Sequence, residues 1–181
     1  MVFPVVAPNG NTIVARKRRT SMRTWKRVAA ILSVCLITGA FGQQVQRSTV
    51  LPMSEAKAVA TRFPKRGPNR ISGAWELTKA DIDSLEVDLS QISGLPKKNK
   101  APWMQIDHPE NYFRQYVGVL QAGQKRVYVS AFCQFMDGDS PTSPEWKNHV
   151  LLVSDGGNCF WQALYDPSSR RFLELWVNGR A

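Results

Sequence analysis

Histidine, cysteine and carboxylate side chains are the groups in this sequence that could support catalysis or hold a metal. The chain has two histidines, and one of them lies in the run Asp107-His108-Pro109-Glu110. Imidazole and carboxylate groups are common zinc ligands, but this spacing matches no zinc-binding pattern. A hydrolase or metal-dependent enzyme would need loop residues to meet in space, namely Asp107, His108, Asp137, Asp139 and His149. We predict no catalytic residue, no metal ligand and no cofactor, and we keep this enzyme as an alternative.

The N-terminal segment has the layout of a secretory signal. Seven Lys and Arg residues between positions 16 and 27 precede an apolar run over 28–41. Ala40-Phe41-Gly42 fits a small-x-small cleavage site, so we predict a signal peptide over 1–42. The apolar run is shorter than the roughly 20 residues of a spanning helix, which favours cleavage over an uncleaved anchor. We expect translation to start at Met22 instead of Met1, because Met22 directly precedes a normal signal.

The strong positive charge belongs mostly to this targeting segment. A net charge of +10 would by itself indicate a nucleic-acid partner. Residues 1–42 carry seven of the 24 basic residues and none of the 14 acidic ones, so their removal lowers the net charge to +3. We therefore expect an exported protein, periplasmic or secreted, with no nucleic-acid partner and no membrane association after cleavage.

The cysteine count is compatible with one disulfide. Cys35 leaves with the predicted signal, and the mature chain keeps Cys133 and Cys159. An even number of cysteines in an oxidising compartment favours a bond between them. The alternative is two buried free thiols that act as small apolar side chains. A Cys–His nucleophile pair has no supporting signature around either residue.

The clearest secondary-structure element is an amphipathic helix that begins after Thr78. Thr78 is a favourable N-cap, and Asp81 completes a variant of the capping box. Apolar residues at steps of three and four form one stripe, which consists of Ile82, Leu85, Leu89 and Ile92. Gly94 and Pro96 end the helix. We interpret the carboxylates off this stripe as a solvated face, namely Asp81, Asp83, Glu86 and Asp88.

Four or five strands are expected after the helix. They are predicted over 112–121, 125–135, 148–154, 159–166 and 171–177. One helix followed by antiparallel strands predicts an α+β fold, a two-layer sandwich with one main helix packed on a four- to five-stranded antiparallel sheet. The domain is expected to span 71–181. Residues 43–70 are expected to be a flexible spacer, in which a short helix over 55–60 is compatible with the sequence.

Aromatic residues on the two central strands are the best candidates for binding. They are Tyr112, Arg114 and Tyr116 on one strand, Tyr128 and Phe132 on the next, and Trp103 and Trp146 in flanking loops. If the strand register brings them together, the open sheet face carries a tyrosine-rich patch with an arginine, a composition favoured at interfaces. The alternative is that these rings pack under the spacer or against one another.

Five short segments occur in a fixed order along the predicted strands. They are Tyr112-Phe113-Arg114-Gln115-Tyr116-Val117-Gly118, Val127-Tyr128-Val129-Ser130-Ala131-Phe132, Val153-Ser154-Asp155-Gly156-Gly157, Tyr165-Asp166-Pro167 and Val177-Asn178-Gly179. In this order they resemble a group of small exported bacterial proteins of uncharacterised function. The resemblance covers residues 73–179 and implies export and a compact α+β domain. It supplies no activity and no catalytic residue.

These observations predict a non-enzymatic binding module that uses the aromatic sheet face. Its partner would be a protein or a cell-envelope ligand. Besides the enzyme described above, a second alternative is an inhibitor of a secreted enzyme. Such an inhibitor would present a protruding loop over 136–147.

Overall fold

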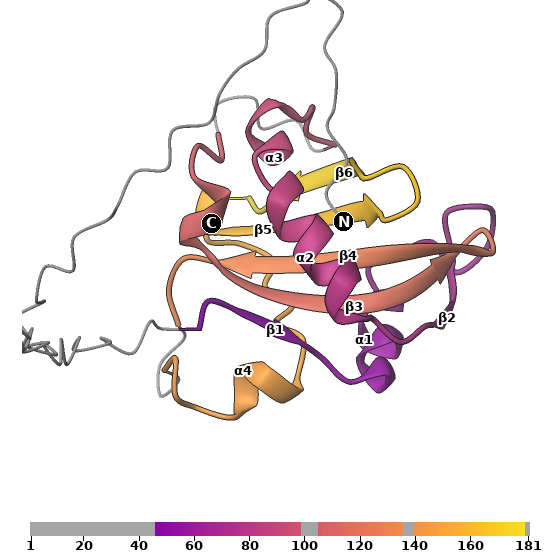
Figure 1. The fold of residues 1–181 in the computed structure, drawn as a ribbon, viewed down its shortest axis with the longest axis horizontal. Helices are drawn as coiled ribbons and strands as arrows, with labels where there is room; N and C mark the ends of the chain where they lie inside the picture. Colours follow the sequence, from indigo (N-terminus) through magenta and orange to yellow (C-terminus); the bar gives the residue numbers. More distant parts are fainter. Residues whose placement is uncertain (1–45, 99–104, 136–139, 180–181) are drawn as a thin grey trace, which may run out of the picture. The chain divides into compact units, whose positions relative to one another are not determined.

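The computed structural model describes residues 46–98, 105–135 and 140–179. This part of the chain forms an α+β domain around one six-stranded sheet (Figure 1). The strands are β1 Ser48–Val50, β2 Ile71–Ala74, β3 Phe113–Gln121, β4 Gln124–Phe132, β5 Phe160–Asp166 and β6 Arg171–Val177. The α-helices are α1 Ala56–Ala60, α2 Lys79–Asp88, α3 Gln91–Gly94 and α4 Glu145–Asn148. Short 3-10 helices lie at Met53–Glu55, Pro109–Asn111 and Gly157–Cys159.

The sheet is mixed in direction, with the strand order β1-β3-β4-β5-β6. The four strands from β3 to β6 form consecutive antiparallel pairs. β1 runs parallel to the first half of β3, and β2 runs antiparallel to the second half of the same strand. The prediction of a strictly antiparallel sheet of four to five strands is therefore wrong. The two additional strands precede the main helix in sequence and are too short to show alternation.

One face of the sheet is covered by α2 and α3, and we call it the helix face (Figure 1). Thr78 and Asp81 form the predicted capping box, with the Thr78 N–H donating to the Asp81 carboxylate at 2.9 Å. The buried stripe residues Leu85 and Leu89 pack in one core with Val127 and other side chains of the sheet. The predicted single helix is divided, because α2 ends at Asp88 and the stripe continues on α3.

The opposite face is covered by α1 and the segments around it, and we call it the α1 face. Val59 is fully buried there and Phe63 is 9% exposed, packed with Val117, Tyr128 and Leu164. The short helix predicted over 55–60 is confirmed as α1. The prediction that 43–70 is a flexible spacer is wrong for its described part, and so is the domain boundary at 71. Residues 48–50 form a strand of the sheet, and Val59 and Phe63 anchor the following segment in the core of the α1 face.

The segment predicted as a strand over 148–154 is not a strand. It crosses the α1 face and is held by the fully buried side chain of Gln115. The Gln115 amide nitrogen donates to the carbonyls of Trp146 at 2.5 Å and His149 at 2.7 Å, and its oxygen accepts from the Leu151 N–H at 2.7 Å. A buried side chain thus takes the place of a neighbouring strand, because backbone polar groups near the core need partners. Both faces of the sheet are therefore covered, so the prediction of a two-layer sandwich with one open sheet face is wrong.

Gly123 and Gly118 each occupy a position where the backbone favours glycine. The β3–β4 hairpin closes through Ala122 and Gly123 at φ values of 51° and 75°, the geometry of a tight two-residue hairpin turn. At Gly118, a Cβ atom would lie 2.1 Å from the carbonyl oxygen of Trp75. The chain that leads from β2 to α2 therefore passes directly against β3 only because this position has no side chain.

The predicted disulfide is confirmed. Cys133 and Cys159 are joined with an S–S distance of 2.04 Å and a Cα–Cα distance of 4.9 Å, within the ordinary range. Cys133 directly follows β4 and Cys159 directly precedes β5, so the bond ties two neighbouring strand ends. It also closes the long connection that covers part of the α1 face.

No helix among the described residues has the length and apolar character needed to cross a bilayer. The predicted signal peptide over 1–42 lies outside the described residues.

Candidate functional site

The predicted aromatic patch is divided between the two faces of the sheet. In the β3–β4 register, Tyr116 lies opposite Val129 and Tyr128 lies opposite Val117. Directly opposed residues share a face, so Tyr116 lies on the helix face and Tyr128 on the α1 face. The other described members of the patch are buried, apart from the half-buried Tyr112. The prediction of one exposed aromatic face is wrong, because alternation fixes faces within a strand but not the pairing between strands.

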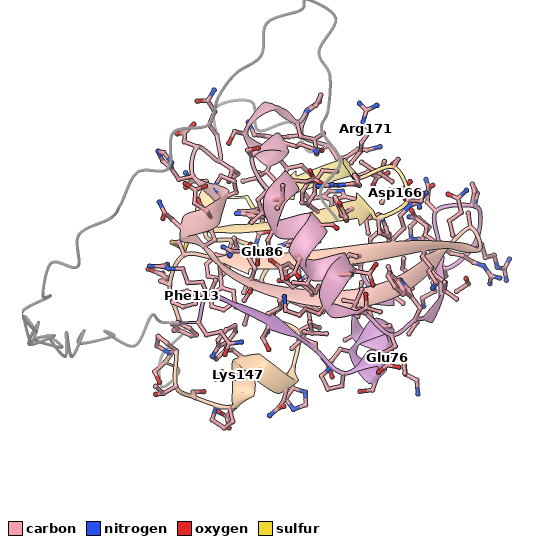
Figure 2. The ribbon with its side chains drawn as sticks, viewed as in Figure 1. Glu76, Glu86, Phe113, Lys147, Asp166 and Arg171 are labelled. Atoms are coloured by element: carbon pink, nitrogen blue, oxygen red, sulfur yellow. A yellow bond between two sulfur atoms is a disulfide. The ribbon has the colours of Figure 1, made fainter. Side chains whose placement is uncertain are left out.

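Arg114 and Tyr116 form a polar cluster with Glu86 of α2, which lies over the sheet (Figure 2). The Arg114 guanidinium pairs with the Glu86 carboxylate at 3.1 Å, and the Tyr116 hydroxyl donates to the same carboxylate at 2.6 Å. Arg114 also donates to the main-chain carbonyls of Glu110 at 2.9 Å and Tyr112 at 2.6 Å. Burial raises the pKa of Tyr116 well above its ordinary value, so its hydroxyl stays a donor. The prediction that Glu86 is solvated is therefore wrong. The hydrogen bonds of this cluster attach α2 to the sheet.

A second cluster joins α2 to the β5–β6 hairpin. The Tyr165 hydroxyl donates to Asp88 at 2.7 Å, and Arg170 donates to the same carboxylate at 3.1 Å. Burial and the bond to Asp88 raise the pKa of Tyr165 to about 12. Asp88 is thus a structural partner and not a solvated residue. The Tyr112 hydroxyl also has a partner within the domain, because it donates to the carbonyl of Asn158 at 2.9 Å.

Phe132 and Trp146 belong to a packed aromatic cluster and not to an exposed patch. Phe132 is 1% exposed and Trp146 is 4% exposed. Their rings lie 6.1 Å apart at 80°, and Phe113 and Phe135 complete the cluster at centroid distances of 4.5–5.9 Å. The predicted loop extension at Trp103 lies outside the described residues. This cluster closes one end of the α1 face and offers no open polar group of its own.

The α1 face has a cavity where its cover is incomplete. The cavity has a volume of about 180 Å³ and is lined by Arg62, Phe63, Tyr128, Gln162 and Trp176. The Phe63 ring stands edge-on to Tyr128, at 6.2 Å and 74°, and to Trp176, at 5.7 Å and 88°. Three aromatic walls therefore meet a guanidinium and an amide. Gln162 and Trp176 lie directly opposite each other on β5 and β6, which places both side chains on this face.

The Tyr128 hydroxyl is the unusual group of this cavity. Of the four tyrosines of the chain, the other three donate their hydroxyls within the domain. Tyr128 is 1% exposed, yet its hydroxyl makes no hydrogen bond to the described part of the chain. The fully enclosed polar atoms without a partner in that part are Arg126 Nε and Trp161 Nε1. The Tyr128 hydroxyl is not among them because it keeps contact with the cavity that Tyr128 lines.

The two histidines are not brought into one site by the described residues. His108 pairs with Glu110 at 3.1 Å, and His149 pairs with Glu55 at 3.3 Å. No group of three or more histidine, cysteine or acidic residues could hold a metal ion within 46–98, 105–135 and 140–179. Asp137 and Asp139, which the enzyme alternative needs, lie outside these ranges. The described end of the loop proposed for an inhibitor does not protrude, because Trp146 anchors it in the aromatic cluster.

Comparisons with protein-family models, curated protein sequences and solved structures find no match. The resemblance to small exported bacterial proteins therefore stays a prediction. The function of this chain has to be argued from the geometry of its own cavity.

Sequence reasoning identified Tyr128 but missed the rest of the cavity. Arg62 and Phe63 lie in the segment interpreted as a spacer, although the step of four from Val59 to Phe63 is a helical spacing. Gln162 and Trp176 lie on a hairpin that was predicted, and its register alone would have paired them. Their position beside Tyr128 depends on the β4–β5 pairing of Ser130 with Gln162, which the sequence does not fix.

Proposed function

We propose that this chain is an exported, disulfide-stabilised binding module and that the cavity on the α1 face is its ligand site. The observation that carries the proposal is the Tyr128 hydroxyl, a donor on a buried side chain that makes no hydrogen bond to the described residues. The hydroxyl keeps contact with the cavity, so its capacity to donate is open to a ligand. A ligand that accepts from this hydroxyl would gain a hydrogen bond and three aromatic walls at the same time.

The size of the cavity limits the ligand to one small group. An apolar protein cavity of about 150 Å³ holds one benzene molecule. The cavity here has about 180 Å³, whereas sites for drug-sized ligands have roughly 300–1,000 Å³. The ligand is therefore a single ring or a group of similar size, either free or carried by a protein or cell-envelope partner.

Export is the second part of the proposal. It is supported by the signal-like segment before Gln43 and by the Cys133–Cys159 bond, because structural disulfides persist in oxidising compartments. Intact-mass analysis of the protein recovered outside the cytoplasm should show a chain that starts at Gln43 and carries one disulfide. Recovery of the chain from the cytosol with residues 1–42 attached would contradict export.

Ring binding is tested by a titration of the full mature domain with phenol, a neutral probe. We expect shifts of the backbone amide signals of Phe63 and Gln162 in two-dimensional NMR spectra, with a Kd of about 1 mM for so small a ligand. Trp176→Leu should weaken binding about tenfold, because it removes one wall. Leu173→Ala is the matched control on the same strand, since Leu173 is 42% exposed and does not line the cavity. The absence of these shifts, or equal binding by both variants, would contradict the proposed site.

A further inference from the structure

The positive charge of the cavity is not compensated by any of the described residues. Arg62 supplies the one charged side chain among the lining residues, and no carboxylate lines the cavity within the described chain. The Arg62 guanidinium donates to the carbonyl of Val153 at 3.3 Å and forms no ion pair with the described residues. Several of its N–H groups are therefore available to a ligand. The segment around it adds positive charge, because no acidic residue occurs between Ala56 and Trp75.

The second polar group at the cavity is also a donor. Burial raises the pKa of Tyr128 far above its ordinary value of 10, an effect that the nearby charge of Arg62 reduces only in part. The hydroxyl therefore stays protonated in neutral solution and can donate to a ligand oxygen. A protonated hydroxyl beside a guanidinium suits an anion better than a cation.

The third polar group is held in a fixed orientation. The Gln162 amide nitrogen donates to the side-chain oxygen of Asn178 at 3.2 Å. The Asn178 amide nitrogen in turn donates to the carbonyls of Val153 at 2.8 Å and Asp155 at 2.9 Å, which settles its orientation. One Gln162 N–H group is therefore engaged with the fold, and the charged donor left for a ligand is the Arg62 guanidinium, with the Tyr128 hydroxyl as a neutral donor.

We infer that the ligand is a small monocarboxylate on a single planar ring, with its carboxylate bound by Arg62 and the Tyr128 hydroxyl and its ring packed against Phe63 and Trp176. This inference rests on the proposed function and specifies the class of ligand. A guanidinium binds a carboxylate through two parallel N–H groups, which gives geometric specificity. The nearly perpendicular Phe63 and Trp176 rings allow one ring to stack on one wall and meet the other edge-on. A cationic ligand, which aromatic cages often bind, is opposed here by the charge of Arg62.

Three probes of similar shape and different charge test the inference: benzoate, benzamide and benzylamine. Titration of the mature, disulfide-bonded protein at low ionic strength should show benzoate binding about tenfold more tightly than benzamide, with benzylamine the weakest. Arg62→Gln should remove the preference of benzoate over benzamide. Arg66→Gln is the matched control. It removes the same charge at a position four residues after Arg62, and the Arg66 side chain does not line the cavity. It should keep most of the preference.

Tyr128→Phe tests the hydroxyl without removing an aromatic wall. It should weaken benzoate binding about tenfold, as expected for the loss of one hydrogen bond to a charged group. Equal affinity for benzoate and benzamide, both weakened by Trp176→Leu, would overturn the carboxylate inference and leave the ring-binding site standing. Tightest binding of benzylamine would overturn it in favour of a cation site. Binding of none of the four probes, phenol included, would refute the proposed function itself.

Discussion

The two faces of the sheet bury tyrosines of the same kind and treat their hydroxyls differently. On the helix face, Tyr116 and Tyr165 each donate to a carboxylate of α2 that also pairs with an arginine. On the α1 face, Tyr128 is buried as deeply as Tyr116 and has no partner in the described chain. The hydroxyls of the helix face attach a helix to the sheet, and the one on the α1 face makes no bond to the described residues, as the proposed ligand site requires.

The two faces also differ in the size of their cavities and in the hydrogen-bonding capacity left in them. The helix face borders an open groove of about 860 Å³, lined in part by Arg47, Glu86, Glu110 and Arg114. Arg114 is the buried cation of that groove, and all its nitrogens donate to partners within the fold. The cavity of the α1 face is much smaller, but the Tyr128 hydroxyl and part of the Arg62 guanidinium there make no hydrogen bond to the described residues. Unused hydrogen-bonding capacity, and not volume, is therefore the basis of the proposed site.

The largest effect is expected from loss of the disulfide. Replacing both Cys133 and Cys159 with serine should lower the free energy of unfolding by about 3.5 kcal/mol, from the chain-entropy relation for a separation of 26 residues. The affected loop covers the α1 face, so benzoate binding should weaken as well. Urea denaturation with and without a reducing agent measures the effect. An unchanged unfolding midpoint in the double variant would show that the α1 face does not depend on this bond.

Glu86→Ala should have the next largest effect, and only on stability. It leaves Arg114 and Tyr116 without their shared acceptor and should cost about 3 kcal/mol, the lower end for a buried pair, because the Glu86 side chain is 29% exposed. Asp83→Ala is the control, since that residue forms an exposed pair on the same helix. Benzoate affinity should stay unchanged in both variants. A loss of affinity in the folded Glu86 variant would show that the two faces are coupled.

The parts of this fold that are continuous in sequence were predictable. The capping box at Thr78 and Asp81, the β3–β4 and β5–β6 hairpins and the disulfide all follow from local patterns. The mixed edge of the sheet was not predictable. β1 and β2 have three and four residues, and their pairing with β3 joins positions that lie far apart in the chain. Short strands carry too few residues to reveal a period.

The candidate site was predicted only through Tyr128. The alternation of side chains along the strand of Tyr128 was recognised. The pairing between strands was not, and it places Tyr116 and Tyr128 on opposite faces of the sheet. Arg62 and Phe63 reach the cavity because Val59 and Phe63 anchor a segment whose polar composition resembles that of a linker. Long-range packing of this kind has no signal in local composition.

A smaller loss of stability is expected when the pH is lowered, from protonation of Asp88 on the helix face. Burial alone would raise the pKa of Asp88, but hydrogen bonds from Arg170 and Tyr165 outweigh it and hold the pKa below the ordinary 3.8. The ionised form therefore favours the fold. This contribution is complete above the unfolded pKa and is lost as the pH falls through the lower, folded pKa. In urea denaturation at about pH 7 and about pH 3, Asp88→Asn should lose less stability than wild type on acidification. Asp83→Asn should retain the wild-type loss, and an equal loss in all three proteins would contradict this role.

The most direct test of the account compares Tyr128→Phe with Tyr165→Phe, two variants that each lose one hydroxyl from a buried ring. Tyr165→Phe should lower the free energy of unfolding by about 1.5 kcal/mol and leave benzoate affinity unchanged. Tyr128→Phe should change stability by less than about 0.5 kcal/mol and weaken benzoate binding. The reverse pattern, with Tyr128→Phe destabilising the domain and binding benzoate as wild type does, would contradict the claim that the fold leaves this hydroxyl for a ligand.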